Sequence, residues 1–208
     1  MNEYIVELAD VHRHVSRESS DAGELVRVTL RRPFAAETHD LWHAVTDPDL
    51  ISRWFMPISG DFREGGHFDL QGNAGGDIEQ CDPPRTFRVT FGDASSVVTV
   101  TMHELAGDRT ELVLDHTVPV TVAGSTAGAL YVGPGWDGAL VGLARFIDGR
   151  AEGDPVQAIN SPKMIQFSRQ SVALWADAAA MGGASAQEVE TARQVALAQF
   201  APDPALGN

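Results

Sequence analysis

Histidines four residues apart are the first feature of this chain whose type and spacing could do chemistry. His39 and His43 have the spacing with which zinc proteases place two ligands on one helix face. Asp40 stands where the H-E-x-x-H motif needs glutamate, and no third ligand is evident nearby. The pair therefore indicates a solvated helix face, and we expect no metal and no cofactor.

Two further motifs favour structural interpretations. Cys81 has no C-x-x-C partner, and the neighbouring Asp82 would raise the pKa of its thiol, so the thiol is a poor nucleophile. A single cysteine also excludes an internal disulfide. Residues 133–135 (GPG) precede a helical pattern without the lysine or hydroxyl residue of a phosphate loop, which indicates a hinge and a helix start.

Alternating apolar residues predict the strands that would position a site. Strand patterns cover Glu24 to Phe34, Thr86 to Phe91, Val97 to His103 and Glu111 to His116, with shorter strands at Phe62, Phe68 to Leu70 and Asp77 to Cys81. Residues 4–6 could form another short strand, and residues 12–23 resemble a polar connection. Hairpin spacing predicts an antiparallel sheet with one covered face.

Helical periodicity and capping signals predict four longer helices. A two-tryptophan segment at 36–55 begins with a helix at Glu37 to Val45, which Asp47-Pro48 ends. The other helices are expected at Trp136 to Ile147, from Ser161-Pro162 to about Met181, and from the capping box at Ser185 to about Phe200. The order of elements predicts an α+β fold in which a curved sheet wraps a helix.

Five segments in this order carry a family resemblance. They are AAETHDLWHAVTDPDLISRWF at 35–55, REGGHF at 63–68, GDIEQCDPPRTF at 76–87, GDRTELVLDHT at 107–117 and GW at 135–136. The chain resembles the SRPBCC superfamily of START-like, helix-grip proteins. Within it, the chain is most similar to the family named for the C-terminal domain of the activator of the heat-shock-protein ATPase. The resemblance includes no counterpart of the co-chaperone's N-terminal domain, so co-chaperone function is not implied.

The resemblance predicts the domain organisation and the class of ligand. We expect an N-terminal extension at 1–23, a ligand-binding domain at 24–150, and a linker with a helical hairpin at 151–208. The resemblance implies a cavity between the sheet and the helix that starts at Trp136. The residues expected to line it are Phe68, Leu70, Phe87, Val89, Met102, Leu114, His116, Trp136 and Leu140. His116 is the one ionisable residue that strand alternation sends to the apolar face, where a polar group among apolar walls suits a pocket.

Charge and composition limit the binding partners and the cellular location that we expect for this protein. The formal net charge of -14 argues against nucleic acid and anionic membrane as partners, because both need a positive surface. The N-terminal residues lack the apolar core of a signal peptide. The longest uncharged stretch, 117–136, contains prolines and glycines that make it a poor membrane span. We therefore expect a cytoplasmic protein.

Three functions fit this pattern, and the sequence does not decide whether the protein is an enzyme. The first is non-catalytic binding of a small hydrophobic or aromatic molecule, oriented by His116. The second is a polyketide cyclase, dehydratase or hydrolase that uses His116, although no second inward polar group is evident. The third is an interaction module, because the tail helices carry more apolar residues than a solvated spacer needs. That tail either docks on the domain or forms a homodimer.

Overall fold

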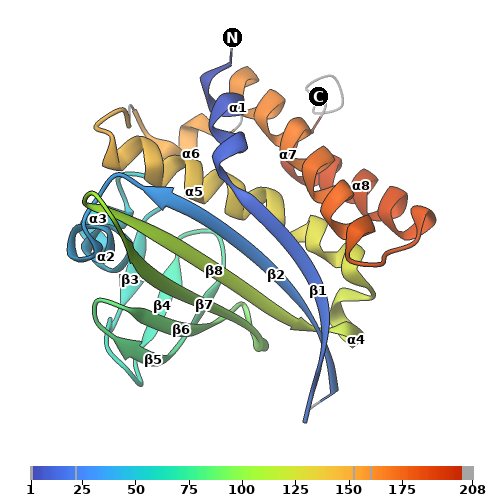
Figure 1. Cartoon of the computed structure of the whole chain (residues 1–208), viewed down its shortest axis with the longest axis horizontal. Coiled ribbons are helices and arrows are strands. Elements are labelled where there is room, and N and C mark those ends of the chain that lie inside the picture. Colours follow the sequence, from blue (N-terminus) through green and yellow to red (C-terminus); the bar gives the residue numbers. More distant parts are fainter. Residues whose placement is uncertain (1, 22, 152, 160, 203–208) are drawn as a thin grey trace. The chain divides into compact units, whose positions relative to one another are not determined.

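The computed structural model describes residues 2–21, 23–151, 153–159 and 161–202. Within these residues eight strands form one sheet in the order β1-β2-β8-β7-β6-β5-β4-β3 (Figure 1). The strands are β1 (His12–Ser20), β2 (Gly23–Phe34), β3 (Ile58–Gly60), β4 (His67–Leu70), β5 (Gly75–Asp82), β6 (Thr86–Phe91), β7 (Asp93–Leu105) and β8 (Arg109–Pro119). All pairs from β3 to β8 are antiparallel. The predicted α+β, helix-grip fold class is confirmed.

The two long C-terminal helices begin where capping chemistry predicts. They are α1 (Glu3–Glu7), η1 (Leu8–Asp10), α2 (Thr38–Thr46), α3 (Pro48–Ile51), α4 (Val120–Ala123), η2 (Thr126–Tyr131), α5 (Gly133–Ile147), α6 (Pro155–Ala158), α7 (Pro162–Met181) and α8 (Ala186–Phe200). The Ser161 side chain accepts a hydrogen bond from the backbone N–H of Met164 and caps α7. Ser185 and Glu188 form the predicted capping box of α8.

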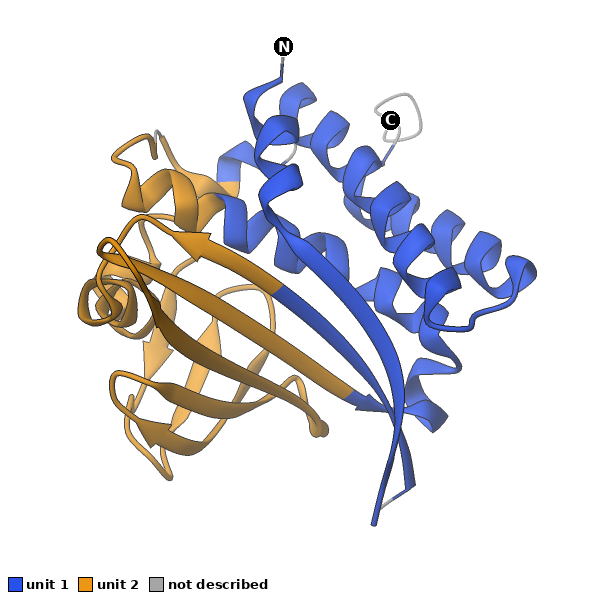
Figure 2. Cartoon of the chain, viewed as in Figure 1, with its two compact units in different colours: residues 1–30, 118–141, 157–208 blue, residues 31–117, 142–156 orange. Residues whose placement is uncertain are grey.

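The chain divides into two compact units (Figure 2). Unit 1 combines residues 1–30, 118–141 and 157–208, and unit 2 combines residues 31–117 and 142–156. The division into an extension, a domain and a tail stays a prediction, and residues 152 and 160 of the predicted linker lie outside the described residues.

A buried carboxylate joins three elements of unit 1. Asp137 of α5 is fully buried, and Arg13 Nε of β1 donates to both of its oxygens at 3.0 Å. From α7, Ser171 Oγ and Trp175 Nε1 donate to Asp137 Oδ2 at 2.5 and 3.0 Å. Burial raises the pKa of Asp137, against the opposing effect of Arg13 and the hydrogen bonds. Helix α7 of the predicted tail therefore packs against β1 and α5 within unit 1.

The two-tryptophan segment is folded within unit 2 as its sequence predicts. Trp42 of α2 is buried and lies edge-on to Phe87 of β6, with ring centroids 5.9 Å apart. Trp54 Nε1 donates to the Ala44 carbonyl oxygen at 2.9 Å, which ties the turn after α3 back to α2. Asp47 ends α2 and caps α3, since its side chain accepts from the Asp49 N–H.

Three local predictions are wrong. The predicted strand at residues 4–6 is helix α1, capped by Asn2, and five residues are too short to show helical periodicity. The polar stretch that we interpreted as a connection is β1, which lacks apolar alternation because Val15 is its one buried residue. Ion pairing supports it instead: Arg27 of β2 donates to both carboxylate oxygens of Glu18 at 2.8 Å. Phe62 lies outside any strand and is exposed.

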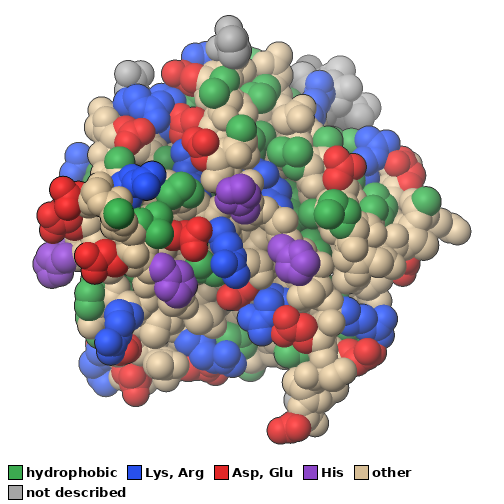
Figure 3. Space-filling view, viewed as in Figure 1, with side chains coloured by type: hydrophobic (Ala, Val, Ile, Leu, Met, Phe, Trp, Pro, Cys, Tyr) green, Lys and Arg blue, Asp and Glu red, His purple; other side chains and the backbone are tan. Residues whose placement is uncertain are grey.

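The surface mixes charges of both signs. Acidic and basic side chains are interspersed over the face that Figure 3 shows, where apolar side chains lie between them. Among the described residues, none of the helices combines the length and the apolar character that a bilayer span requires.

Candidate functional site

The apolar face of the sheet in unit 2 is built from cross-strand rows. One row runs through Ile78, Val89, Val98 and His116, and the next runs through Phe87, Val100 and Leu114. Directly opposed residues share a face, so these rows define one surface, which we call the inner face. The row between them on the other face contains Arg88, Thr99 and Asp115, all at least partly exposed. In these rows the inner face is the more buried one, and the row on the outer face reaches solvent.

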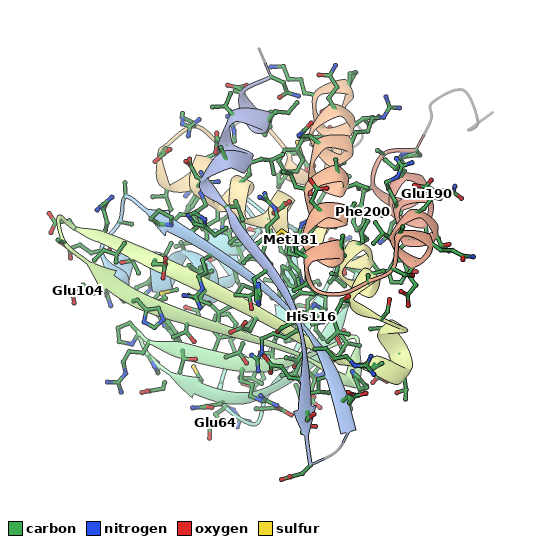
Figure 4. All side chains as sticks on the ribbon, turned by 45° about the vertical axis from the view of Figure 1, so that its right-hand side comes forward. Glu64, Glu104, His116, Met181, Glu190 and Phe200 are labelled. Atoms are coloured by element: carbon green, nitrogen blue, oxygen red, sulfur yellow. The ribbon has the colours of Figure 1, made fainter. Side chains whose placement is uncertain are left out.

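His116 is the polar member of the first row (labelled in Figure 4). Its side chain is 2% exposed, and its Nε2 lies 2.8 Å from Ser96 Oγ of β7. The Phe91 ring meets the imidazole edge-on, with centroids 6.0 Å apart. Because Ser96 and Phe91 are only partly buried, the hydrogen-bonded pair extends from the covered interior toward solvent.

Burial sets the charge state of the pair. It lowers the pKa of His116 from 6.5 to about 4, so the ring is neutral at pH 7. A neutral imidazole has one donor and one acceptor nitrogen, and the Ser96 hydroxyl can either donate to Nε2 or accept from it. The pair can therefore present an uncharged hydrogen-bonding group of either polarity among apolar side chains. As a general base it is weak at neutral pH, because its pKa lies far below the operating pH.

Aromatic side chains continue the inner face beside this pair. Phe68 of β4 and Phe91 of β6 have ring centroids 6.4 Å apart. Phe91 bridges Phe68 and His116 through these two ring contacts. Unit 2 thus holds a cluster of aromatic rings next to its buried histidine.

The predicted site residues divide between the two units. Phe68, Leu70, Val89, Met102, Leu114 and His116 are buried in unit 2, where Phe87 is partly buried. Trp136, which is partly buried, and Leu140, which is buried, belong to the part of α5 in unit 1. Their common role as the lining of one cavity stays a prediction.

Sequence reasoning missed several polar groups of unit 2. Ser96 precedes Val98 by two residues on β7, so strand alternation could have placed it on the inner face. Arg32 is 5% exposed, with its Cζ 5.7 Å from the Phe34 ring centroid, and the same alternation could have found it. Arg145 of α5 is also buried, and its Nη2 donates to the Arg150 carbonyl oxygen at 3.2 Å. Unit 2 thus buries more polar groups than the single histidine that we expected.

The other residues with possible chemistry have local explanations. Burial, Glu64 and Asp82 raise the pKa of the partly buried Cys81, as the sequence indicates. His67 and His103 are exposed. Across the described parts of the chain, no group of three or more His, Cys, Asp or Glu side chains could hold a metal ion.

The architecture and the inner face define the class of the protein. An antiparallel curved sheet with C-terminal helices is the helix-grip fold of SRPBCC-type proteins, which include polyketide cyclase-like members. Residues 35–148 match the model of the family described as "Activator of Hsp90 ATPase homolog 1-like protein". The chain belongs to this family.

Solved structures agree with this assignment. The crystal structure of CalU16 from Micromonospora echinospora is 35% identical, covers 82% of this chain and 98% of its own, and has a TM-score of 0.67. The solution structure of CalU16 is 36% identical over 83% of this chain and 97% of its own, with a TM-score of 0.70. EF2215 from Enterococcus faecalis shares the fold at 15% identity, with a TM-score of 0.61 and coverage of 88% and 98%. A comparison with curated proteins found no match.

Proposed function

We propose that this protein binds a small apolar or aromatic molecule that carries at least one oxygen, held against the inner face of unit 2. The observation that carries the proposal is the hydrogen bond between Ser96 and the buried, neutral His116, which lies at the β8 end of an apolar row. Apolar burial supplies the affinity, and the pair fixes the orientation by bonding a hydroxyl or carbonyl of the ligand.

Acid–base catalysis is the second candidate, and the proximity of Ser96 to His116 is what favours it. A serine hydroxyl 2.8 Å from an imidazole nitrogen is the geometry of an activated nucleophile. The environment opposes this function, because burial holds the pKa of His116 at about 4. Such a base takes a proton weakly at neutral pH. We therefore assign the pair to recognition.

The experiment titrates the full chain with oxygenated bicyclic and tricyclic aromatic probes, 2-naphthol first, by isothermal titration calorimetry. We expect saturable binding of one probe molecule per chain. Ser96→Ala should weaken binding by about 2- to 12-fold, the equivalent of one neutral hydrogen bond. The matched control is Ser95→Ala, since Ser95 is exposed and its hydroxyl bonds Asp93 instead.

Two results would contradict the proposal. One is the absence of saturable binding by every probe to a chain that unfolds cooperatively. The other is equal affinity of wild type and Ser96→Ala for every probe that binds. Turnover of a probe ester that disappears in both Ser96→Ala and His116→Gln would instead support the catalytic candidate.

A further inference from the structure

Helix α2 carries two histidines on its solvent side. His39 and His43 are both exposed, although the flanking Leu41, Trp42 and Ala44 are buried. The two imidazole rings already meet, with centroids 4.5 Å apart and planes at 80°. A nine-residue helix holds the pair at this spacing, and Trp42 anchors that helix on Phe87. The fold therefore keeps the two side chains next to each other on one face of the helix.

This geometry is close to what a shared metal ion needs. Imidazole nitrogens bind first-row transition metals at about 2.0–2.1 Å, so two nitrogens on one ion lie about 3–4 Å apart. Rings whose centroids are 4.5 Å apart can reach that separation by rotating their exposed side chains. Because both rings reach solvent, water can complete the coordination of the ion.

We propose that His39 and His43 form a two-histidine chelate for a divalent transition metal on the surface of α2. Imidazole donors suit Cu²⁺, Ni²⁺ and Zn²⁺, whereas Mg²⁺ and Ca²⁺ prefer oxygen ligands. The site differs from the three-ligand zinc centre that the sequence excludes, because the protein supplies two ligands here. It is independent of the inner face and of the proposed ligand, since it involves neither Ser96 nor His116.

The chelate also predicts coupling between metal binding and the stability of α2. The helix brings the two rings together only in the folded chain, so the ion binds the folded state more tightly than the unfolded state. Saturating metal should therefore raise the midpoint of thermal unfolding.

The test titrates the full chain with NiCl₂ and ZnCl₂ by isothermal titration calorimetry, with MgCl₂ as the oxygen-seeking control. We expect a site for Ni²⁺ and Zn²⁺ that Mg²⁺ does not occupy. His39→Ala and His43→Ala should each weaken it by at least about tenfold, because the second ligand then no longer binds intramolecularly. His43→Gln should do the same while it keeps a polar surface.

Other exposed histidines provide matched controls. His14→Ala on β1 and His103→Ala on β7 remove an exposed imidazole that is not part of α2 and should leave this site unchanged. Wild-type affinity in both α2 variants would overturn the proposal, as would loss of binding in His14→Ala or His103→Ala alone. Circular dichroism of each variant verifies that the chain keeps its overall helix content.

Discussion

Replacement of His116 by glutamine should remove a large part of the acid sensitivity of this protein. Burial lowers the pKa of His116 from 6.5 to about 4 in the folded chain. Glutamine keeps a polar group that can bond Ser96 but does not titrate. The difference in stability between wild type and His116→Gln therefore isolates one titrating group from the many carboxylates of this acidic chain.

The sign and size of the effect follow from proton linkage. Between pH 6.5 and about 4 the unfolded chain binds a proton at this position and the folded chain does not, so stability falls as the pH is lowered. The contribution is complete above pH 6.5 and is lost as the pH falls through this window to about 4. The lowering of the pKa from 6.5 to about 4 corresponds to about 3 kcal/mol in all, of which about 2 kcal/mol is lost between about pH 7.5 and about pH 5.

Urea unfolding, followed by tryptophan fluorescence at a series of pH values, measures this directly. The free energy of unfolding of His116→Gln is subtracted from that of wild type at each pH. We expect the difference to decrease by about 2 kcal/mol from about pH 7.5 to about pH 5. A difference that does not change with pH would refute the reasoning, because the folded and unfolded chains would then bind this proton equally well.

Two further predictions concern the buried carboxylate and the close packing in unit 1. Asp137→Leu should destabilise the chain by about 3–5 kcal/mol, because it leaves the charge of Arg13 buried without its partner. Arg13→Met/Asp137→Leu should lose less than that in urea unfolding, and additive losses would contradict this. Gly133→Ala should cost about 1–3 kcal/mol, because its Cβ would lie 2.3 Å from Trp175 Cδ2. Gly135→Ala, where the nearest atom is 3.5 Å away, should instead stabilise α5 by up to about 1 kcal/mol, and equal thermal shifts of the two alanine variants would disprove the packing argument.

The elements that could be predicted are those whose signals are local. The ends of α2, α7 and α8 depend on proline and on capping side chains that lie within a few residues. The structure contains all three helices. Strands β6, β7 and β8 alternate in sequence because their inner-face residues are mainly apolar and their outer-face residues mainly polar. In each case the residue pattern within one segment contains the physical cause of the structure.

The elements that could not be predicted depend on distant partners. Strand β1 is polar, and it is stable because β2 supplies both its hydrogen-bonding edge and the partner of Glu18. Asp137 looks like a surface carboxylate in the sequence, yet it accepts bonds from residues 124, 34 and 38 positions away. No window of local sequence contains those partners, so neither feature has a local signal.

The candidate site could be predicted in part. Alternation placed His116 on the covered face, and it could have placed Ser96 there too, but alternation does not reveal that the two side chains are bonded. The proposal of recognition instead of catalysis rests on that bond and on the burial around it. A histidine that stays neutral down to about pH 4 orients a ligand without the cost of a buried charge, and for the same reason it is a poor proton acceptor at pH 7. The pH series on His116→Gln therefore tests the function as well as the stability: a folded-state pKa near 6.5 would favour acid–base chemistry over the binding function proposed above.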